Sequence, residues 1–586
     1  MSMWKYLFYG ISAFAFVFGF GEYFHGDEFF GNESIINAFL FAGALFLMRE
    51  AYDTVEKRIR LYGGVGGAVL SVVLIIGNRL YTEGNLRTLF STGAFVKAGI
   101  GFWGFAAVLG AILMLVLHHL VKVENLPMTK VWKFFRKPGA VAICLFLAWL
   151  PCYLAYYPGI FSYDVELQTG QALGYLTVNR WHPPLHTYFW RLCLMIERGV
   201  GIHALVCYSI TQMLMLASAF SYTIHFLVKR GVNNWIVLGS FLFFALNPVI
   251  AIFSFVHTKD AMLAVFLVLY TVGLADFLAD RQSYRKSIWK HAKLIIPAIF
   301  CCLLRNNMVY GIVLATVLMV CFQKKLWKQV LLWCGCILLG YGLINGPLYN
   351  ALGVTKGSSG EMMSVPMQQL SYVVYCHEAE LSAEDKAAIG AYLPVEELAE
   401  RYNPRLADTV KGDFNSARLD EDPVAFLKMW ASFLVRYPLE YIEAFLNLNL
   451  PYWYPDACSL DAYSRKAYIE THVMDTTEFG YEVVRESKIP WLLEKYSKVA
   501  TYEVFLTKPI IANVFAIGTP IWVLLFGVLV VFLKNRRDML LPLLPAIGLW
   551  CTFLLGPVSN FRYMYPIIVL YPVYIALILQ TDKVRS

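Results

Sequence analysis

Long apolar runs recur along almost the whole chain, and short polar segments separate them. A helix needs about 20 apolar residues to cross a bilayer, and the runs predict about 14 such helices. The predicted spans are 4–20, 34–48, 61–79, 95–119, 139–157, 202–227, 233–254, 260–277, 293–304, 308–322, 329–347, 511–533, 539–556 and 563–580. We therefore expect an all-α polytopic membrane protein.

Polar residues group into one long segment, which divides the chain. Segment 187–199 is apolar on one side but carries three charges, so we expect a helix that lies in the membrane interface. The predicted units are an extra N-terminal transmembrane module (1–130), a transmembrane core (131–347) with a catalytic outer loop (158–190), an extracytoplasmic, mainly helical domain (348–510), and C-terminal transmembrane helices (511–586).

The composition agrees with a membrane protein: 58% of the 586 residues are hydrophobic and only 15% are charged. Lys and Arg concentrate in every second loop, so the net charge of +8 indicates orientation rather than nucleic-acid binding. By the positive-inside rule these loops and both termini are cytoplasmic, and the protein is a multi-pass protein of the cell membrane.

The 12 cysteines are scattered and show no zinc-binding spacing, which argues against a metal framework. Cys376 and Cys458 both fall in the hydrophilic segment. Their spacing leaves a disulfide between them open.

Charged side chains gather at the predicted outer ends of the spans. They are Asp164, Glu166 and His182 in the outer loop, Lys259 and Asp260 at the start of one span, Arg305 between two short helices, and Arg562 at the start of the last span. Charge so close to hydrocarbon is costly and typical of functional sites. Several cations beside a carboxylate predict a site for an anionic, lipid-linked substrate.

Each of these residues also has a purely structural interpretation. Asp164 suits the cap of a short helix, and His182 precedes two prolines that favour a first helical turn. Lys259 and Asp260 could pair with each other, and Arg562 could anchor the chain at lipid headgroups. The prediction of a site depends on their shared side of the membrane.

The pattern resembles the GT-C superfamily of membrane glycosyltransferases, which includes the protein O-mannosyltransferases and the lipid A aminoarabinose transferases. The resemblance lies in the acidic loop at Asp164, the His-Pro-Pro-Leu run at 182–185, Lys259-Asp260, Arg305, and Arg562-Tyr563 followed by Pro566. It covers about 139–347 and 511–580. The closest resemblance is to uncharacterised bacterial members of the superfamily.

The resemblance implies an inverting transfer of a sugar from a polyprenyl-phosphate donor to a hydroxyl group on the extracytoplasmic face. It implies that Asp164 is the general base and that Glu166 and His182 belong to the catalytic site. It also implies that the donor phosphate is bound by Lys259, Arg305 and Arg562. Asp260 and Tyr563 are expected to support these binding residues. The expected partners are the lipid bilayer, the donor, and a glycan, glycolipid or protein acceptor of the cell envelope. No cofactor is expected, and a divalent cation between the two loop carboxylates remains an alternative.

The chain departs from the family pattern in three places. Val165 separates Asp164 from Glu166 where many members have adjacent acids, four spans precede the core, and 348–510 matches no familiar domain. The competing hypothesis is a transporter or flippase of a lipid-linked or anionic solute. A transporter would place its ionisable groups near the bilayer midplane and often shows an internal repeat, and neither feature is visible here.

Overall fold

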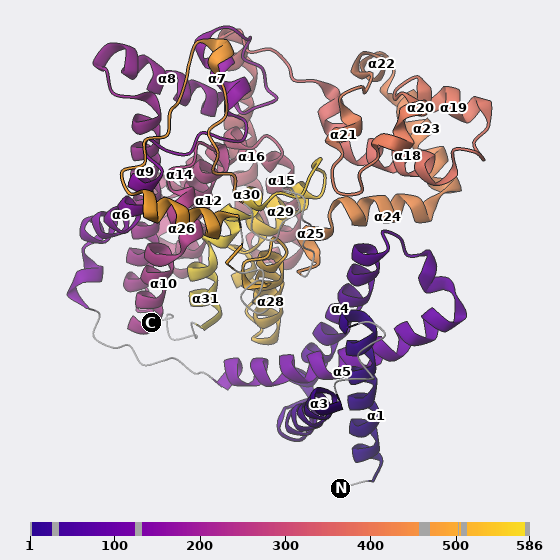
Figure 1. The fold of residues 1–586 in the computed structure, drawn as a ribbon. Helices are drawn as coiled ribbons and strands as arrows, with labels where there is room; N and C mark the ends of the chain where they lie inside the picture. Colours follow the sequence, from indigo (N-terminus) through magenta and orange to yellow (C-terminus); the bar gives the residue numbers. More distant parts are fainter. Residues whose placement is uncertain are drawn as a thin grey trace.

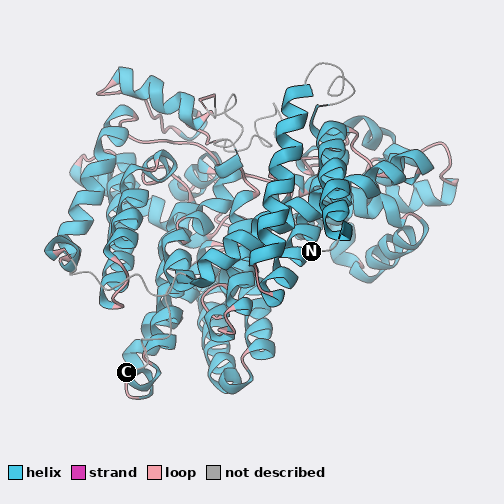
Figure 2. Ribbon diagram, turned by 90° about the horizontal axis from the view of Figure 1, so that it is seen from below, coloured by secondary structure: helices cyan, strands magenta, loops and turns pink. Residues whose placement is uncertain are grey.

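The computed structural model describes residues 3–25, 34–122, 132–455, 469–501, 503–504 and 513–579, and throughout these ranges the regular structure is helical (Figure 2). Nine described helical segments are long and apolar enough to cross a membrane. They are Met3–Phe24, Ile35–Thr54, Lys57–Thr82, Thr92–Val121, Pro138–Ala155, Ala204–Lys229, Lys259–Ala279, Lys324–Ala351 and Phe561–Leu579. Shorter apolar helices accompany them, so the chain is an all-α, multi-pass membrane protein.

The first four long helices pack together around an apolar core to which residues 526–533 also contribute. They are α1 (Met3–Phe20), α3 (Ser34–Thr54), α4 (Lys57–Thr82) and α5 (Thr92–Lys122). Small residues let α4 and α5 approach closely, as is common between membrane helices. Gly63 and Gly67 of α4 face Gly110 of α5, and a Cβ atom on Gly67 would lie only 2.4 Å from the Gly110 nitrogen.

A second group of helices forms the largest core of the molecule. It comprises α6 (Pro138–Ala155), α9 (Ala204–Lys229), α10 (Asn234–Leu246), α11 (Pro248–Phe253), α12 (Lys259–Ala279), α13 (Arg281–Arg285), α14 (Ile288–Leu304), α15 (Met308–Phe322), α16 (Trp327–Leu343), α28 (Thr519–Leu533), α29 (Leu544–Phe553), α30 (Phe561–Ile568) and α31 (Tyr571–Leu579). Most of α12 is buried, and it packs against α9, α14 and α30. This central helix carries two of the predicted site residues at its first turn.

Two helices cover one end of this bundle, α7 (Val165–Leu173) and α8 (Pro184–Val200) (Figure 1). The start of α1 and the end of α31 lie on the opposite side of the molecule in the same view. The segment predicted to lie in the interface falls within α8, which is amphipathic and is not among the candidate spans.

Further described helices lie between α16 and α28 in the chain, and most of them form a lobe at the upper right of Figure 1. They are α17 (Tyr349–Ala351), α18 (Ser364–His377), α19 (Ala383–Gly390), α20 (Val395–Arg401), α21 (Asp408–Lys411), α22 (Ser416–Glu421), α23 (Pro423–Arg436), α24 (Pro438–Leu448), α25 (Leu450–Trp453) and α26 (Pro490–Ala500). Helices α18 to α24 enclose a separate apolar core, whereas α26 packs against α6.

Several predicted spans are shorter in the structure than in the sequence pattern. The run 233–254 is broken at Pro248 into α10 and α11, and the side chain of Asn247 caps the second piece by accepting a hydrogen bond from Val249 N at 2.9 Å. The runs 511–533 and 539–556 yield only α28 and α29. The structure therefore supports nine long candidate spans, and the total of about 14 stays a prediction. Cys458 lies outside the described residues.

The glycine contact between α4 and α5 can be tested by comparing two alanine substitutions. Gly67→Ala should lower the unfolding free energy by about 1–3 kcal/mol, because the new methyl group meets backbone atoms of α5. Gly99→Ala is the matched control on α5, since a Cβ atom there meets nothing within 4 Å, and its effect should stay within about 0.5 kcal/mol. Thermal unfolding in detergent measures both, and equal melting temperatures would contradict the packing.

Candidate functional site

The loop that carries Asp164 is fixed to two other parts of the chain by backbone hydrogen bonds. His257 N donates to the carbonyl oxygen of Ile160 at 3.0 Å, just before α12 begins. Met474 N donates to the carbonyl oxygen of Phe161 at 2.7 Å. Asp164 is the last residue before α7, so these contacts set the position of its carboxylate.

The start of α12 brings a cation to this carboxylate. The side chain of Thr258 caps the helix by accepting a hydrogen bond from Asp260 N at 3.4 Å, so Lys259 is the first helical residue. Lys259 Nζ donates to Asp164 Oδ2 at 2.7 Å. Both side chains are largely buried, with 14% and 20% of their surface exposed.

The start of α30 brings a second cation to the same carboxylate. The side chain of Asn560 caps this helix and accepts a hydrogen bond from Arg562 N at 3.0 Å. Arg562 Nη2 then donates to Asp164 Oδ1 at 3.2 Å, and Arg562 Nε lies 3.8 Å from Asp260 Oδ2. Arg562 therefore lies between two carboxylates and links α30 to both the loop and α12.

Arg305 extends the network from the turn between α14 and α15. Its Nη1 donates to Asp260 Oδ1 at 3.0 Å. Its guanidinium carbon also lies 4.3 Å from the ring centre of Tyr563 and 4.5 Å from that of Phe553, in the range of cation–π contacts. The hydroxyl of Tyr563 accepts a hydrogen bond from Arg562 at 3.3 Å.

His182 lies beside the ion pair and is neutral. Its Nδ1 atom is 3.7 Å from Asp164 Oδ2 and 3.5 Å from Lys259 Nζ, and its ring stacks on Trp181. Burial lowers the pKa of His182 to about 4, which the attraction of Asp164 only partly offsets. A neutral imidazole at pH 7 can donate a hydrogen bond through one ring nitrogen and accept one through the other without adding charge to the site.

Asp164 is ionised throughout the ordinary pH range. Burial opposes its ionisation, but the charges of Arg562 and Lys259 outweigh burial and hold the pKa of this carboxyl well below its ordinary value. The pKa is lower in the folded than in the unfolded protein. The ion pairs therefore stabilise the fold above the ordinary pKa of Asp, and the stabilisation is lost as the pH falls through the lowered value.

The network has unused hydrogen-bond donors. Among the described residues, Lys259, Arg305 and Arg562 form ion pairs with the carboxylates of Asp164 and Asp260. Within the described ranges, Arg562 Nε and Nη1 and Arg305 Nε are buried without a hydrogen-bond partner. Buried N–H groups are normally satisfied, so these donors suit a bound anion.

Glu166 is the one predicted site residue that lies apart from this network. It is exposed on α7, and the described part of the chain offers it no ion pair or hydrogen bond. The structure brings together the other seven predicted residues, namely Asp164, His182, Lys259, Asp260, Arg305, Arg562 and Tyr563. No group of three metal-ligating side chains occurs among the described residues.

Two residues near Asp164 carry no sequence signal. Tyr163 adopts a left-handed backbone conformation with φ of 67°, which is uncommon for a residue with a side chain, and its ring lies 4.5 Å from the guanidinium carbon of Arg562. The Tyr163 hydroxyl accepts a hydrogen bond from Glu470 N at 3.0 Å. Glu470 comes from the long polar segment, where no motif marks it.

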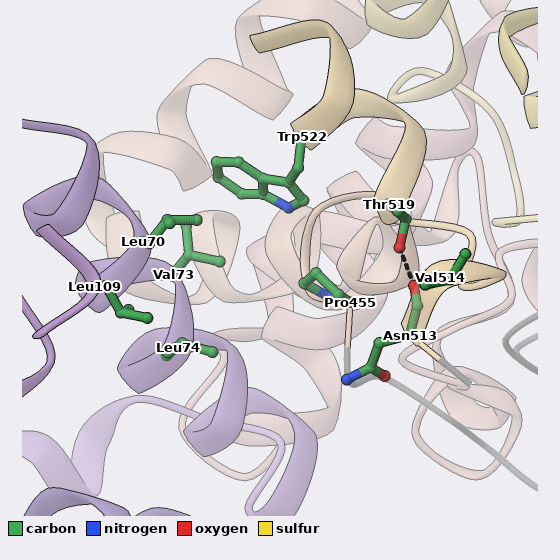
Figure 3. Close-up of a pocket in the computed structure, with 9 residues that line it drawn as sticks. All are labelled: Leu70, Val73, Leu74, Leu109, Pro455, Asn513, Val514, Thr519 and Trp522. Atoms are coloured by element: carbon green, nitrogen blue, oxygen red, sulfur yellow. Dashed lines mark hydrogen bonds between the residues drawn. The ribbon is translucent and has the colours of Figure 1, made fainter. Parts of the chain in front are cut away.

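An apolar cavity of about 530 Å³ lies between α4, α5 and the start of α28 (Figure 3). Leu74 of α4, Leu109 of α5 and Trp522 of α28 line it, together with Pro455 and Asn513. All three helices are apolar, so the cavity opens within the part of the molecule that lipid surrounds.

The short helix α25 separates this cavity from the charged network. On the cavity side, Trp522 Nε1 donates to the carbonyl oxygen of Trp453 at 2.8 Å. On the other side, the Tyr452 hydroxyl accepts a hydrogen bond from Asn560 N at 3.3 Å, two residues before Arg562. The cavity and the cationic site are therefore neighbours across a single turn of helix.

The fold and this network define a multi-pass, all-helical membrane protein with a buried cationic site at one end of its bundle. The chain belongs to DUF6020, a family of unknown function whose sequence profile matches residues 198–585. The match includes the segments that supply all three cations and Asp260 but begins after Asp164. No curated protein and no solved structure shows a significant match.

The ion pair of Asp164 can be measured with a double-mutant cycle. Asp164→Asn should lower the unfolding free energy by about 3–5 kcal/mol, because it leaves two buried cations without their shared partner. Adding Lys259→Met should cost less than the sum of the two single changes, with a coupling of about 1–3 kcal/mol.

Thermal and denaturant unfolding in detergent would measure the cycle. Glu166→Gln is the matched control in the same loop, and it should change stability by no more than about 0.5 kcal/mol since the side chain is exposed. Strictly additive losses at Asp164 and Lys259 would show that the two charges do not interact.

Proposed function

We propose that this protein is a glycosyltransferase that moves a sugar from a polyprenyl-phosphate donor to an acceptor hydroxyl on the extracytoplasmic face of the membrane. The observation that carries the proposal is the carboxylate of Asp164 held between Lys259 and Arg562, beside cationic N–H groups that have no hydrogen-bond partner among the described residues. Arg and Lys side chains are the usual ligands of phosphate. The resemblance of the loop and the His-Pro-Pro-Leu run to GT-C enzymes suggests the reaction.

The chemistry is a single displacement with inversion at the anomeric carbon. Asp164 takes the proton of the acceptor hydroxyl as the acceptor oxygen bonds to the anomeric carbon. The bond from that carbon to the phosphate oxygen breaks, and its electron pair stays on the lipid phosphate. Lys259, Arg305 and Arg562 stabilise the charge that develops there.

Donor binding would also prepare the base. Lys259 and Arg562 keep the pKa of Asp164 well below its ordinary value, and such a weakly basic carboxylate is a poor proton acceptor. A phosphate that draws these cations toward itself weakens the ion pairs and raises the pKa of Asp164. The carboxylate thus becomes a useful base only when the donor is present.

The lipid part of the donor needs an apolar path beside the site. The cavity between α4, α5 and α28 offers one, because α25 contacts both α28 beside the cavity and the start of α30. In this arrangement the phosphate meets the cations at the end of the bundle while the polyprenyl chain lies among the helices.

The reaction can be tested with purified protein in lipid nanodiscs and a panel of polyprenyl-phosphate sugars. Wild type should release free polyprenyl phosphate from at least one donor, and Asp164→Asn should reduce the rate about 10²–10⁴-fold, the usual contribution of a general base. Glu482→Gln removes an exposed carboxylate and should leave the rate unchanged.

Release of polyprenyl phosphate distinguishes the proposal from transport. Movement of an intact donor across a vesicle membrane without release would favour the transporter. Equal release by wild type and Asp164→Asn, with both proteins folded, would remove Asp164 from the role of base.

The path of the lipid chain can be tested by filling the cavity. Leu74→Trp should raise the KM for a long-chain donor about tenfold while a donor with a two-isoprene chain is little affected, because only the long chain reaches the cavity. Leu61→Trp is the matched control on α4, where the side chain is 66% exposed and does not line the cavity. An equal effect on both donors would place the chain elsewhere.

A further inference from the structure

An extended strap, residues 469–488, runs along the outside of the bundle from the loop of Asp164 to α26 (Figure 1). Its backbone is fixed to the end of α6, since Glu486 N donates to the carbonyl oxygen of Tyr157 and Lys488 N to that of Leu154, both at 2.9 Å. These hydrogen bonds hold the last part of the strap against α6.

The first part of the strap places Glu470 next to Asp164. Glu470 N donates to the Tyr163 hydroxyl at 3.0 Å, and the carbonyl oxygen of Glu470 accepts a hydrogen bond from Ser162 Oγ at 3.1 Å. Both contacts involve the two residues that precede Asp164. The Glu470 carboxyl is close enough to feel the charges of Arg562 and Asp164.

The two neighbouring carboxylates have different surroundings. Asp164 accepts hydrogen bonds from two cations, whereas the carboxyl of Glu470 is hydrogen-bonded to the backbone of Tyr163 and forms no ion pair with another described residue. Burial raises the pKa of Glu470, and the charge of Arg562 only partly opposes this. Glu470 is partly exposed, so a ligand can reach it.

The chemistry of a carboxylate limits what Glu470 can bind. An ionised carboxylate only accepts hydrogen bonds, and it repels phosphate, so the donor phosphate is excluded as its ligand. Its two oxygens can accept hydrogen bonds from two adjacent hydroxyl groups at once, in the same bidentate arrangement that carboxylates form with arginine.

We propose that Glu470 and Asp164 form the acceptor subsite, and that the acceptor is a polyhydroxylated carbohydrate whose neighbouring hydroxyls Glu470 binds. This inference rests on the proposed function. Glu470 holds the acceptor so that one hydroxyl faces Asp164, which takes its proton. A serine or threonine side chain has a single hydroxyl and would leave Glu470 without a ligand.

The test measures transfer from the donor found above to methyl glycosides and to a peptide that contains serine and threonine. Wild type should use a glycoside with a kcat/KM at least tenfold above that of the peptide. Glu470→Gln should raise the KM for the glycoside about tenfold more than it raises the KM for the donor. The reason is that the neutral amide forms weaker hydrogen bonds with the glycoside hydroxyls than the charged carboxylate does. Glu470→Asp should recover part of the loss.

Glu482→Gln is the matched control, because it removes an exposed carboxylate from the same strap, and it should change neither KM. Equal use of peptide and glycoside by wild type, or an unchanged glycoside KM in folded Glu470→Gln, would overturn the acceptor subsite and leave the transferase intact. A wild type that consumes no donor with any acceptor would overturn the transferase itself and this inference with it.

Discussion

The carboxylate of Asp164 is the group on which the arrangement of this bundle end depends. It accepts hydrogen bonds from Lys259, 95 residues away, and from Arg562, 398 residues away. Two buried cations without an opposing charge would be costly, so the loop and the starts of α12 and α30 must meet. Asp260 likewise forms ion pairs with two cations, Arg305 and Arg562. Together these ion pairs form one continuous chain of alternating charge.

This chain of charges also explains why the site suits an anion. Three cations converge beside the carboxylates of Asp164 and Asp260, and buried N–H groups of two arginines have no partner within the described ranges. A phosphate could accept hydrogen bonds from these groups. The same cations that stabilise the fold would then stabilise the leaving group, so structural and chemical roles coincide in the same side chains.

The charged network has an apolar cavity on one side and a polar strap on another, and each favours a different kind of ligand. Apolar helices of the N-terminal group and α28 enclose a cavity on one side of α25, where only a hydrocarbon chain is favoured. The polar strap with Glu470 lies against the loop that carries Asp164. A lipid-linked donor and a hydroxylated acceptor would in this way approach the same carboxylate through different environments.

The sequence by itself determined the helical, multi-pass character and most of the charged residues of the site, because apolar periodicity and buried charge are local signals. Tertiary structure decided the pairings. Lys259 and Asp260 are adjacent in sequence yet bind different partners, since successive residues on a helix point in different directions. Glu470 had no signal at all, because its place beside Asp164 depends on contacts between segments about 300 residues apart.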